Sequence, residues 1–241
     1  MEPATNPPPL LTLRDVDVDI AGSKILHGVS FDVAATGVTA LLGRNGVGKT
    51  STLLATMGLL PRTGRISFDG RRIERDRTHR IVQSGIGYVP EDREVFAGLS
   101  VAENLRLAER GPNPRYEFVH ALFPELAKRR RQAAGTLSGG QQQMLSLGRV
   151  LLADNRLLLV DEPTKGLAPQ VVQQVAVALE RIAEHTPVLL VEQNLAVVRR
   201  LADRAVVLNQ GRVVHDGDAH ELLADPALTQ RLLGVSSGEA A

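Results

Sequence analysis

Three short runs of almost continuous apolar residues constrain the fold of this 241-residue chain most strongly. They are residues 38–42 (VTALL), 157–160 (LLLV) and 188–191 (VLLV). A strand that is apolar at nearly every position is buried on both faces, as in a parallel or mixed sheet covered by helices. Helical patterns separate the runs, at residues 50–60, 141–152 and 171–184. Buried strands alternating with amphipathic helices predict an α/β domain with a largely parallel core sheet.

The beginning and the end of the chain carry strand patterns of another kind. Residues 16–20 alternate apolar and acidic side chains, and residues 29–33 resume the alternation after a turn at 21–23. This period of two predicts an antiparallel start. A helix around 194–203 is expected near the other end, followed by a hairpin that turns at Asn209-Gln210-Gly211.

The middle of the chain is mostly helical in pattern and is interrupted by several Gly and Pro residues. We therefore expect a helical lobe at about 92–150, inserted into a core formed by residues 10–91 and 151–234. The proline-rich residues 1–9 are expected to form a disordered lead, and residues 235–241 a loose tail.

Composition excludes several classes of function. The chain has 28 Lys and Arg against 27 Asp and Glu, so its net charge of +1 gives no electrostatic case for nucleic acid as a partner. It has no Cys, and its six His show no metal-ligand spacing. The start lacks the features of a signal peptide, and no run approaches the roughly 20 apolar residues that span a bilayer. We expect any membrane role to come through partners.

Residues 43–50 (GRNGVGKT) fit the phosphate-loop pattern G-x-x-x-x-G-K-[ST] between a buried strand and a helix. The glycines let successive N–H groups converge on phosphate oxygens, and the helix N-terminus adds positive potential. Lys49 would reach the β- and γ-phosphates, and the Thr50 hydroxyl can ligate Mg²⁺. A glycine-rich turn with a chance Lys-Thr is the alternative, which the flanking strand and helix disfavour. The predicted nucleotide-binding residues are Gly43, Arg44, Asn45, Gly46, Val47, Gly48, Lys49, Thr50 and Ser51.

Two carboxylates, Asp161 and Glu162, end the apolar run at 157–160. Ligands of α/β sheets bind at the carboxyl ends of the strands. Asp161 is therefore placed to bind Mg²⁺, and Glu162 to polarise an attacking water. A solvated strand end would explain the pair if it stood alone, but the phosphate loop upstream favours the catalytic interpretation.

The chain resembles the ABC ATPase family in residues 136–143 (TLSGGQQQ), which contain that family's LSGGQ signature. The resemblance covers residues 10–234 and implies a P-loop NTPase core of ABC type with an N-terminal antiparallel β-subdomain and an inserted helical subdomain. It implies ATP and Mg²⁺ as cofactors. The start of the signature helix can offer a hydroxyl and backbone N–H groups to an anion. By resemblance, these groups cap the γ-phosphate held by another subunit, whereas an ordinary Ser-capped helix is the alternative. The residues concerned are Ser138, Gly139, Gly140 and Gln141.

A finer resemblance is to the ATP-binding subunits of branched-chain amino acid importers, in the shorter of their two ATPase types. It rests on residues 88–96, 127–136, 162–169 and 191–194. It implies two transmembrane permease subunits, indirectly a solute-binding protein, and a location on the cytoplasmic face of the cell membrane. Urea and amide importers carry similar subunits, and an exporter ATPase stays open. A soluble ABC ATPase is disfavoured because the gap from Thr50 to Leu137 is too short for a coiled-coil insertion.

Four positions depart from the general pattern of this family. Ile20 stands where an aromatic residue stacks on adenine, Glu91 replaces a Gln, Ala168 an Asp and Gln193 a His. The last three changes also occur in the shorter importer type and favour it. We expect a heterodimer with a second ABC ATPase subunit that supplies the His, with a homodimer as the alternative. The predicted catalytic residues are Glu162, Gln193 and Glu91, and the predicted metal ligands are Thr50, Asp161 and Glu91.

Overall fold

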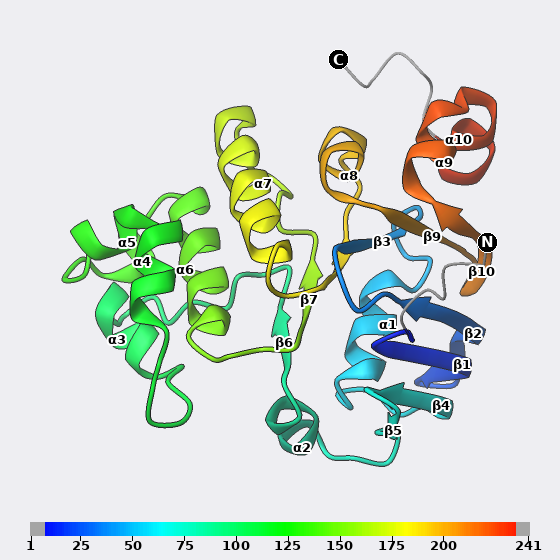
Figure 1. Ribbon diagram of the computed structural model, residues 1–241, viewed down its shortest axis with the longest axis horizontal. Coiled ribbons are helices and arrows are strands. Elements are labelled where there is room, and N and C mark those ends of the chain that lie inside the picture. Colours follow the sequence, from blue (N-terminus) through cyan, green and yellow to red (C-terminus); the bar gives the residue numbers. More distant parts are fainter. Residues whose placement is uncertain (1–7, 235–241) are drawn as a thin grey trace, which may run out of the picture.

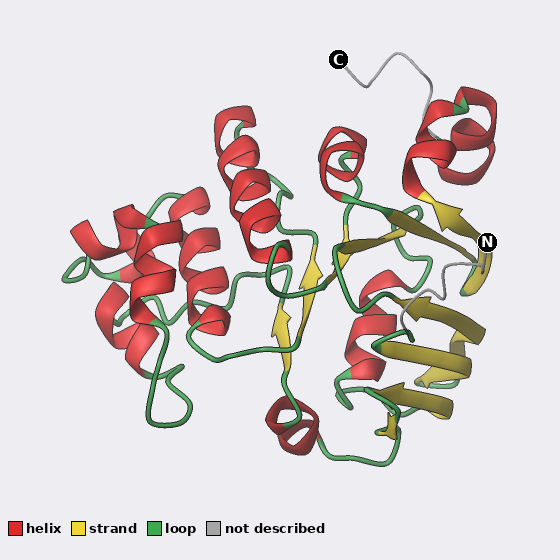
Figure 2. Ribbon diagram, in the orientation of Figure 1, coloured by secondary structure: helices red, strands yellow, loops and turns green. Residues whose placement is uncertain are grey.

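The computed structural model of the chain describes residues 8–234. The tail expected at 235–241 and most of the expected lead therefore lie outside the described residues. The chain forms two sheets and a set of helices that cover them (Figures 1 and 2). The larger sheet has six strands in the order β10-β9-β3-β8-β7-β6, and the smaller has four in the order β2-β1-β4-β5.

The six-stranded sheet contains the three apolar runs side by side at its centre. These are β3 (Val38–Leu42), β8 (Val188–Val191) and β7 (Leu157–Asp161), all parallel to one another. Parallel neighbours flank them, and the hairpin strand at one edge runs antiparallel. The sheet is thus mixed and largely parallel, as predicted. The flanking strands are β6 (Ile86–Val89), β9 (Arg204–Asn209) and β10 (Arg212–Asp218).

The four-stranded sheet is antiparallel and begins with the two predicted strands, β1 (Leu11–Ile20) and β2 (Ser23–Val33). β4 (Thr63–Phe68) and β5 (Arg71–Arg72) extend it, and the sequence patterns do not indicate them. Their signal is weak because β4 buries only two apolar side chains, at its carboxyl end.

Alternate residues of the core strands face opposite layers. Leu157 and Leu159 pack with the antiparallel sheet and with α1 (Lys49–Thr56), which lies between the two sheets. Leu158 and Val160 face the helices on the other side. Both faces of the six-stranded sheet are covered by apolar side chains from other elements. These strands are therefore apolar at nearly every position and do not alternate with polar residues. The covering helices are α6 (Gly139–Leu151), α7 (Pro169–Ala183), α8 (Leu195–Leu201) and α9 (Ala219–Ala224).

Several helices group at one end of the molecule, on the left in Figure 1. α6 packs on α3, α4 and α5 and also contacts β6, so it joins this group to the sheet. Among residues 8–234, no helix combines the length and the apolar character needed to cross a bilayer. The remaining helices are α2 (Thr78–Gln83), α3 (Val101–Arg106), α4 (Tyr116–Leu122), α5 (Pro124–Lys128) and α10 (Pro226–Leu233).

The turn between β9 and β10 connects both sheets to the loop that follows β3. The N–H of Gly211 donates to the carbonyl of Val47 at 3.0 Å, and the carbonyl of Gly211 accepts from the N–H of His27 at 2.8 Å. Gly211 has φ 71°, and a Cβ there would lie 2.2 Å from the Ile25 carbonyl. Only glycine fits this position without displacing backbone.

Candidate active site

The predicted phosphate loop leaves β3 at Gly43 and enters α1 at Lys49. Gly43 has φ 141° and Gly48 has φ 109°, conformations that residues with a Cβ rarely adopt. A Cβ would lie 2.4 Å from the Leu208 carbonyl oxygen at Gly43, and 2.5 Å from a methyl of Leu26 at Gly48. The two glycines are therefore required by the close approach of both sheets to the loop.

The side chain of Lys49 is buried at the mouth of this loop. Its Nζ donates to the carbonyl oxygens of Gly43 at 2.8 Å and Arg44 at 3.0 Å. It also lies 3.6 Å from Oε1 of Glu162. Burial lowers the pKa of Lys49, and the charge of Glu162 opposes that shift. The geometry thus places a cation between the loop and the predicted catalytic carboxylate.

Asp161 is the last residue of β7 and has none of its surface exposed. Its Oδ2 lies 3.5 Å from the Tyr88 hydroxyl, and its Oδ1 has no hydrogen-bond partner in the described part of the chain. Burial raises the pKa of Asp161 to about 6, while a hydrogen bond with Thr50 lowers it. Oδ1 of Asp161 and the hydroxyl of Thr50 are both oxygen donors. Hard divalent cations prefer such donors. Within residues 8–234, no cluster of three or more His, Cys, Asp or Glu could hold a metal without other donors.

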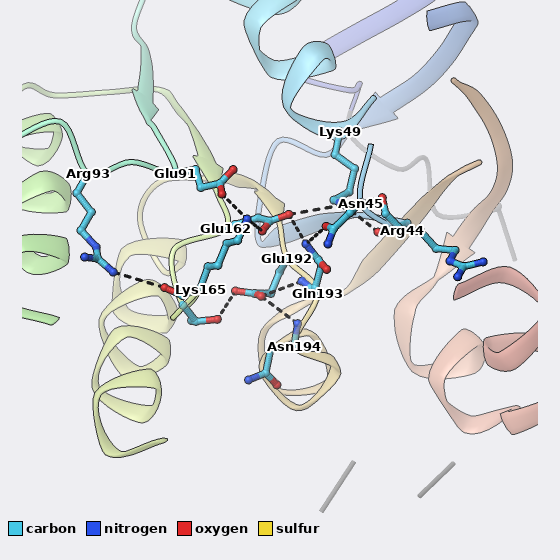
Figure 3. A network of polar contacts seen from close by, with 12 residues as sticks. Arg44, Asn45, Lys49, Glu91, Arg93, Glu162, Lys165, Glu192, Gln193 and Asn194 are labelled. Atoms are coloured by element: carbon cyan, nitrogen blue, oxygen red, sulfur yellow. Dashed lines mark hydrogen bonds and ion pairs between the residues drawn. The ribbon is translucent and has the colours of Figure 1, made fainter. Parts of the chain in front are cut away.

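Glu162 adopts φ 42°, a conformation that is strained for a residue other than glycine. Its N–H donates to the carbonyl of Val191 at 2.9 Å, which fixes the backbone against β8. Its Oε1 accepts a hydrogen bond from Nε2 of Gln193, which also donates to Oδ1 of Asn45 at 2.6 Å. Figure 3 shows this chain of contacts from the end of β7 to the phosphate loop.

Glu91 follows β6 and points toward the same acidic end of β7 (Figure 3). It forms an ion pair with Lys165, and Nζ of Lys165 also lies 3.5 Å from Oε2 of Glu162. The sequence does not indicate a role for Lys165, because nothing in its spacing shows that it lies beside Glu91.

Glu192 is a second residue of this site that the sequence pattern does not reveal. Its carboxylate is buried and accepts three hydrogen bonds, from the Thr164 hydroxyl at 2.7 Å and from the N–H groups of Gln193 at 2.8 Å and Asn194 at 2.9 Å. Burial raises the pKa of Glu192. Because it holds the backbone of Gln193, it sets the direction of that side chain. The only signal in the sequence is an acid that directly follows a fully apolar strand.

The signature residues do not meet the phosphate loop of the same chain. Ser138 caps α6: its Oγ accepts from the N–H of Gln141 at 3.3 Å, and its own N–H donates to Oε1 of Gln141 at 3.0 Å. Gly139 and Gly140 form the first turn of α6, which lies beyond β6 and β7 as seen from α1 (Figure 1). The start of α6 therefore does not belong to the site formed by residues 43–50.

Ile20, the residue predicted to contact a base, is the last residue of β1 and pairs with Ser23 across the hairpin. Its side chain is 40% exposed. Ala168 precedes α7 and offers no side-chain cap to it. Neither residue belongs to the network of Glu162 and Gln193.

Comparison with known proteins places these features in one family. A family model described as ABC transporter matches residues 26–165. The chain is 41% identical over 233 residues to the high-affinity branched-chain amino acid transport ATP-binding protein BraG of Pseudomonas aeruginosa, an alignment that covers 93% of this chain and all of BraG. It is 33% identical to the probable branched-chain amino acid transport ATP-binding protein LivF of Archaeoglobus fulgidus, over 92% of this chain and 99% of LivF.

Two further similarities extend the comparison. The lipopolysaccharide export system ATP-binding protein LptB of Escherichia coli is 30% identical, with 93% of this chain and 97% of LptB covered. The crystal structure of an ATP-binding cassette of an ABC transporter in its ADP conformation superposes with a TM-score of 0.77 at 25% identity, covering 93% of this chain and 98% of that one. The chain therefore belongs to the ABC transporter family, as the ATP-binding and ATP-hydrolysing subunit of such a transporter.

Proposed function

We propose that this ATPase drives an importer of branched-chain amino acids. The observation that carries the substrate class is the higher identity with BraG, 41%, than with LptB, 30%, over nearly the same length. The replacements at Glu91, Ala168 and Gln193 support it, because the shorter ATPase type of such importers has the same replacements.

The geometry supports a role for each residue around the nucleotide. Backbone N–H groups of residues 43–50 cradle the phosphates, and Lys49 exchanges its bonds to the loop carbonyls for bonds to phosphate oxygens. Glu162 polarises the attacking water, while Gln193 orients Glu162 and donates to the γ-phosphate. Glu91 is the third catalytic residue that we propose, and the segment after β6 places it at the same end of β7.

The oxygen atoms present fit a bound Mg²⁺. Thr50 and Asp161 would hold it, since Oδ1 of Asp161 is buried and has no partner in the described part of the chain. When bound, the ion neutralises charge on the phosphates. A third ligand from Glu91 completes the set that we propose.

The assembly that we propose contains a second ABC ATPase subunit and two permease subunits at the cytoplasmic face of the membrane. A solute-binding protein acts on the other side, and nucleic acid has no part. Ser138, Gly139, Gly140 and Gln141 cap the nucleotide of the partner ATPase, because the start of α6 lies away from the phosphate loop of its own chain. ATP then joins the two subunits, and hydrolysis releases them.

Uptake by cells tests the proposal. We expect replacement of this gene by a Glu162→Gln variant to reduce uptake of labelled leucine to background and to leave uptake of urea unchanged, because the water then lacks its activating carboxylate. Glu180→Gln, an exposed position on α7 that pairs with Arg200, serves as the matched control. Loss of urea uptake alone would support a urea or amide importer. Unchanged uptake of both solutes would contradict an import role and favour export.

A further inference from the structure

Three carboxylates gather at the end of β7, beside the phosphate loop. Asp161 lies close enough to Glu162 and Glu91 for both charges to disfavour its ionised form. Lys49 lies 3.6 Å from the nearest of these groups. Like charges that surround a phosphate site weaken the binding of anions. Glu91, a neutral Gln in the wider pattern, therefore adds repulsion that the site must offset.

Lys165 lies where it can offset that charge. Its Nζ pairs with Oε1 of Glu91 and lies 3.5 Å from Oε2 of Glu162. The other oxygen of Glu162, Oε1, faces Lys49. The Glu162 carboxylate is thus held between two cations, one from the phosphate loop and one from the segment that follows β7 (Figure 3).

The backbone of Lys165 is fixed as well as its side chain. Its N–H donates to the carbonyl of Glu162 at 3.2 Å, and its carbonyl accepts from a guanidinium nitrogen of Arg93 at 3.5 Å. Arg93 belongs to the segment after Glu91, so a second contact, from the Arg93 side chain to the Lys165 backbone, joins the two segments that carry the ion pair. This double attachment holds the ammonium group beside both carboxylates.

The pair is exposed enough that the fold does not depend on it. The side chain of Lys165 is 54% exposed and that of Glu91 is 34% exposed. Exposed ion pairs contribute little to stability because water screens them. The effect of Lys165 is therefore expected on the charge and geometry of the site, and substitutions there are expected to fold.

We propose that Lys165 is a positioning residue that neutralises Glu91 and holds Glu162 in place, so that ATP with its Mg²⁺ binds beside three carboxylates. This inference rests on the proposed roles of Glu91 and Glu162. Removal of Lys165 matters because it leaves Glu91 uncompensated, so its effect must depend on the charge at position 91.

Calorimetric titration of the full chain with ATP and Mg²⁺ tests this dependence. We expect Lys165→Gln to weaken binding about tenfold when Glu91 is present, equivalent to about 1.4 kcal/mol. In a Glu91→Gln background the same change is expected to weaken binding less than about twofold, because position 91 then carries no charge and Glu162 keeps Lys49 as its partner. Lys165→Arg keeps the charge and is expected to retain binding within about twofold.

The control is Lys128→Gln, which removes another exposed lysine that pairs with a glutamate, Glu125, on α5. Thermal unfolding of each variant verifies folding. An equal effect of Lys165→Gln in both backgrounds, or no effect when Glu91 is present, would overturn the inference. If Lys49→Ala leaves binding of ATP unchanged, the proposed phosphate site itself is wrong, so the two failures are distinguishable.

Discussion

At the residue scale, Asp161 is buried in a way that opposes folding. Burial raises its pKa from 3.8 to about 6, so the folded protein binds this proton more tightly than the unfolded chain does. Stability therefore falls as the pH rises from about 4 to about 6, and the penalty is fully present above that range. The shift corresponds to about 3 kcal/mol. Such a cost indicates a residue retained for its site and not for its fold.

We expect Asp161→Asn to stabilise the chain without nucleotide and with metal chelated. The free energy of unfolding is expected to rise by about 3 kcal/mol near pH 8 and by about half of that near pH 5. The gain is smaller at pH 5 because the wild-type carboxyl is largely protonated in the folded state at that pH. Urea unfolding at the two pH values measures it. Asp154→Asn, at an exposed acid paired with Arg115, controls for the substitution type. If Asp161→Asn is less stable than the wild type at high pH, the buried charge of Asp161 does not oppose folding and this interpretation is wrong.

Much of the candidate site follows from motifs that link a residue type to a fixed spacing. The positions of Lys49, Asp161 and Glu162 were predictable because a strand, a turn and a helix N-terminus determine them locally. The contacts of Lys165 and Glu192 were not, since they join segments far apart in sequence, such as Glu91 to Lys165 and Thr164 to Glu192. No local pattern encodes which segments meet.

At the element scale, the contact between α6 and α7 depends on Gly140. A Cβ at Gly140 would lie 2.3 Å from Cγ1 of Val171. Valine is branched at Cβ and cannot easily rotate away. Gly140, the second glycine of the signature, thus allows α6 and α7 to pack closely. Its lack of a side chain also leaves its own N–H accessible.

We expect Gly140→Ala to destabilise the chain by about 1–3 kcal/mol, because the new methyl overpacks the contact. A second change, Val171→Ala, is expected to recover most of that loss by making room. Gly139→Ala is the control, since its Cβ would meet only the mobile end of Arg93 at 3.1 Å. Urea unfolding compares them. Equal losses at both glycines, or no recovery in the double variant, would contradict the packing argument.

The elements themselves were predictable to different degrees. The continuous apolar runs of β3, β7 and β8 determine their places at the centre of the sheet. β6 gave no such signal because it contains Gly87, where a Cβ would lie 2.7 Å from side chains of Leu158 and Val150. That glycine is needed for the close approach of α6, a tertiary requirement that weakens the local strand pattern.

At the scale of the whole molecule, the phosphate loop and the signature helix lie on opposite sides of β6 and β7 (Figure 1). In the assembly that we propose, a single chain therefore contributes halves of two different sites. The amide of Gln193 donates hydrogen bonds but, unlike the imidazole of His, it cannot take up and release a proton. This supports the proposal of an unlike partner ATPase.

We expect the tagged chain to co-purify from its own cells with a different ABC ATPase, and the isolated chain to hydrolyse ATP slowly. Gln193→His is expected to raise turnover of the isolated chain by up to about tenfold, less than the effect of supplying a missing donor. Gln173→His, an exposed position that contacts Arg200 on α8, is the control. Brisk turnover by an ATP-dependent homodimer that Gln193→His leaves unchanged would contradict the unlike pair.

The turn at Gly211 links the antiparallel sheet to the phosphate loop. One peptide unit on either side of this residue bonds to the nucleotide cradle through Val47 and to β2 through His27. Two hydrogen bonds that share one glycine thus join the phosphate loop to β2, so the position of the loop is coupled to that of the antiparallel sheet.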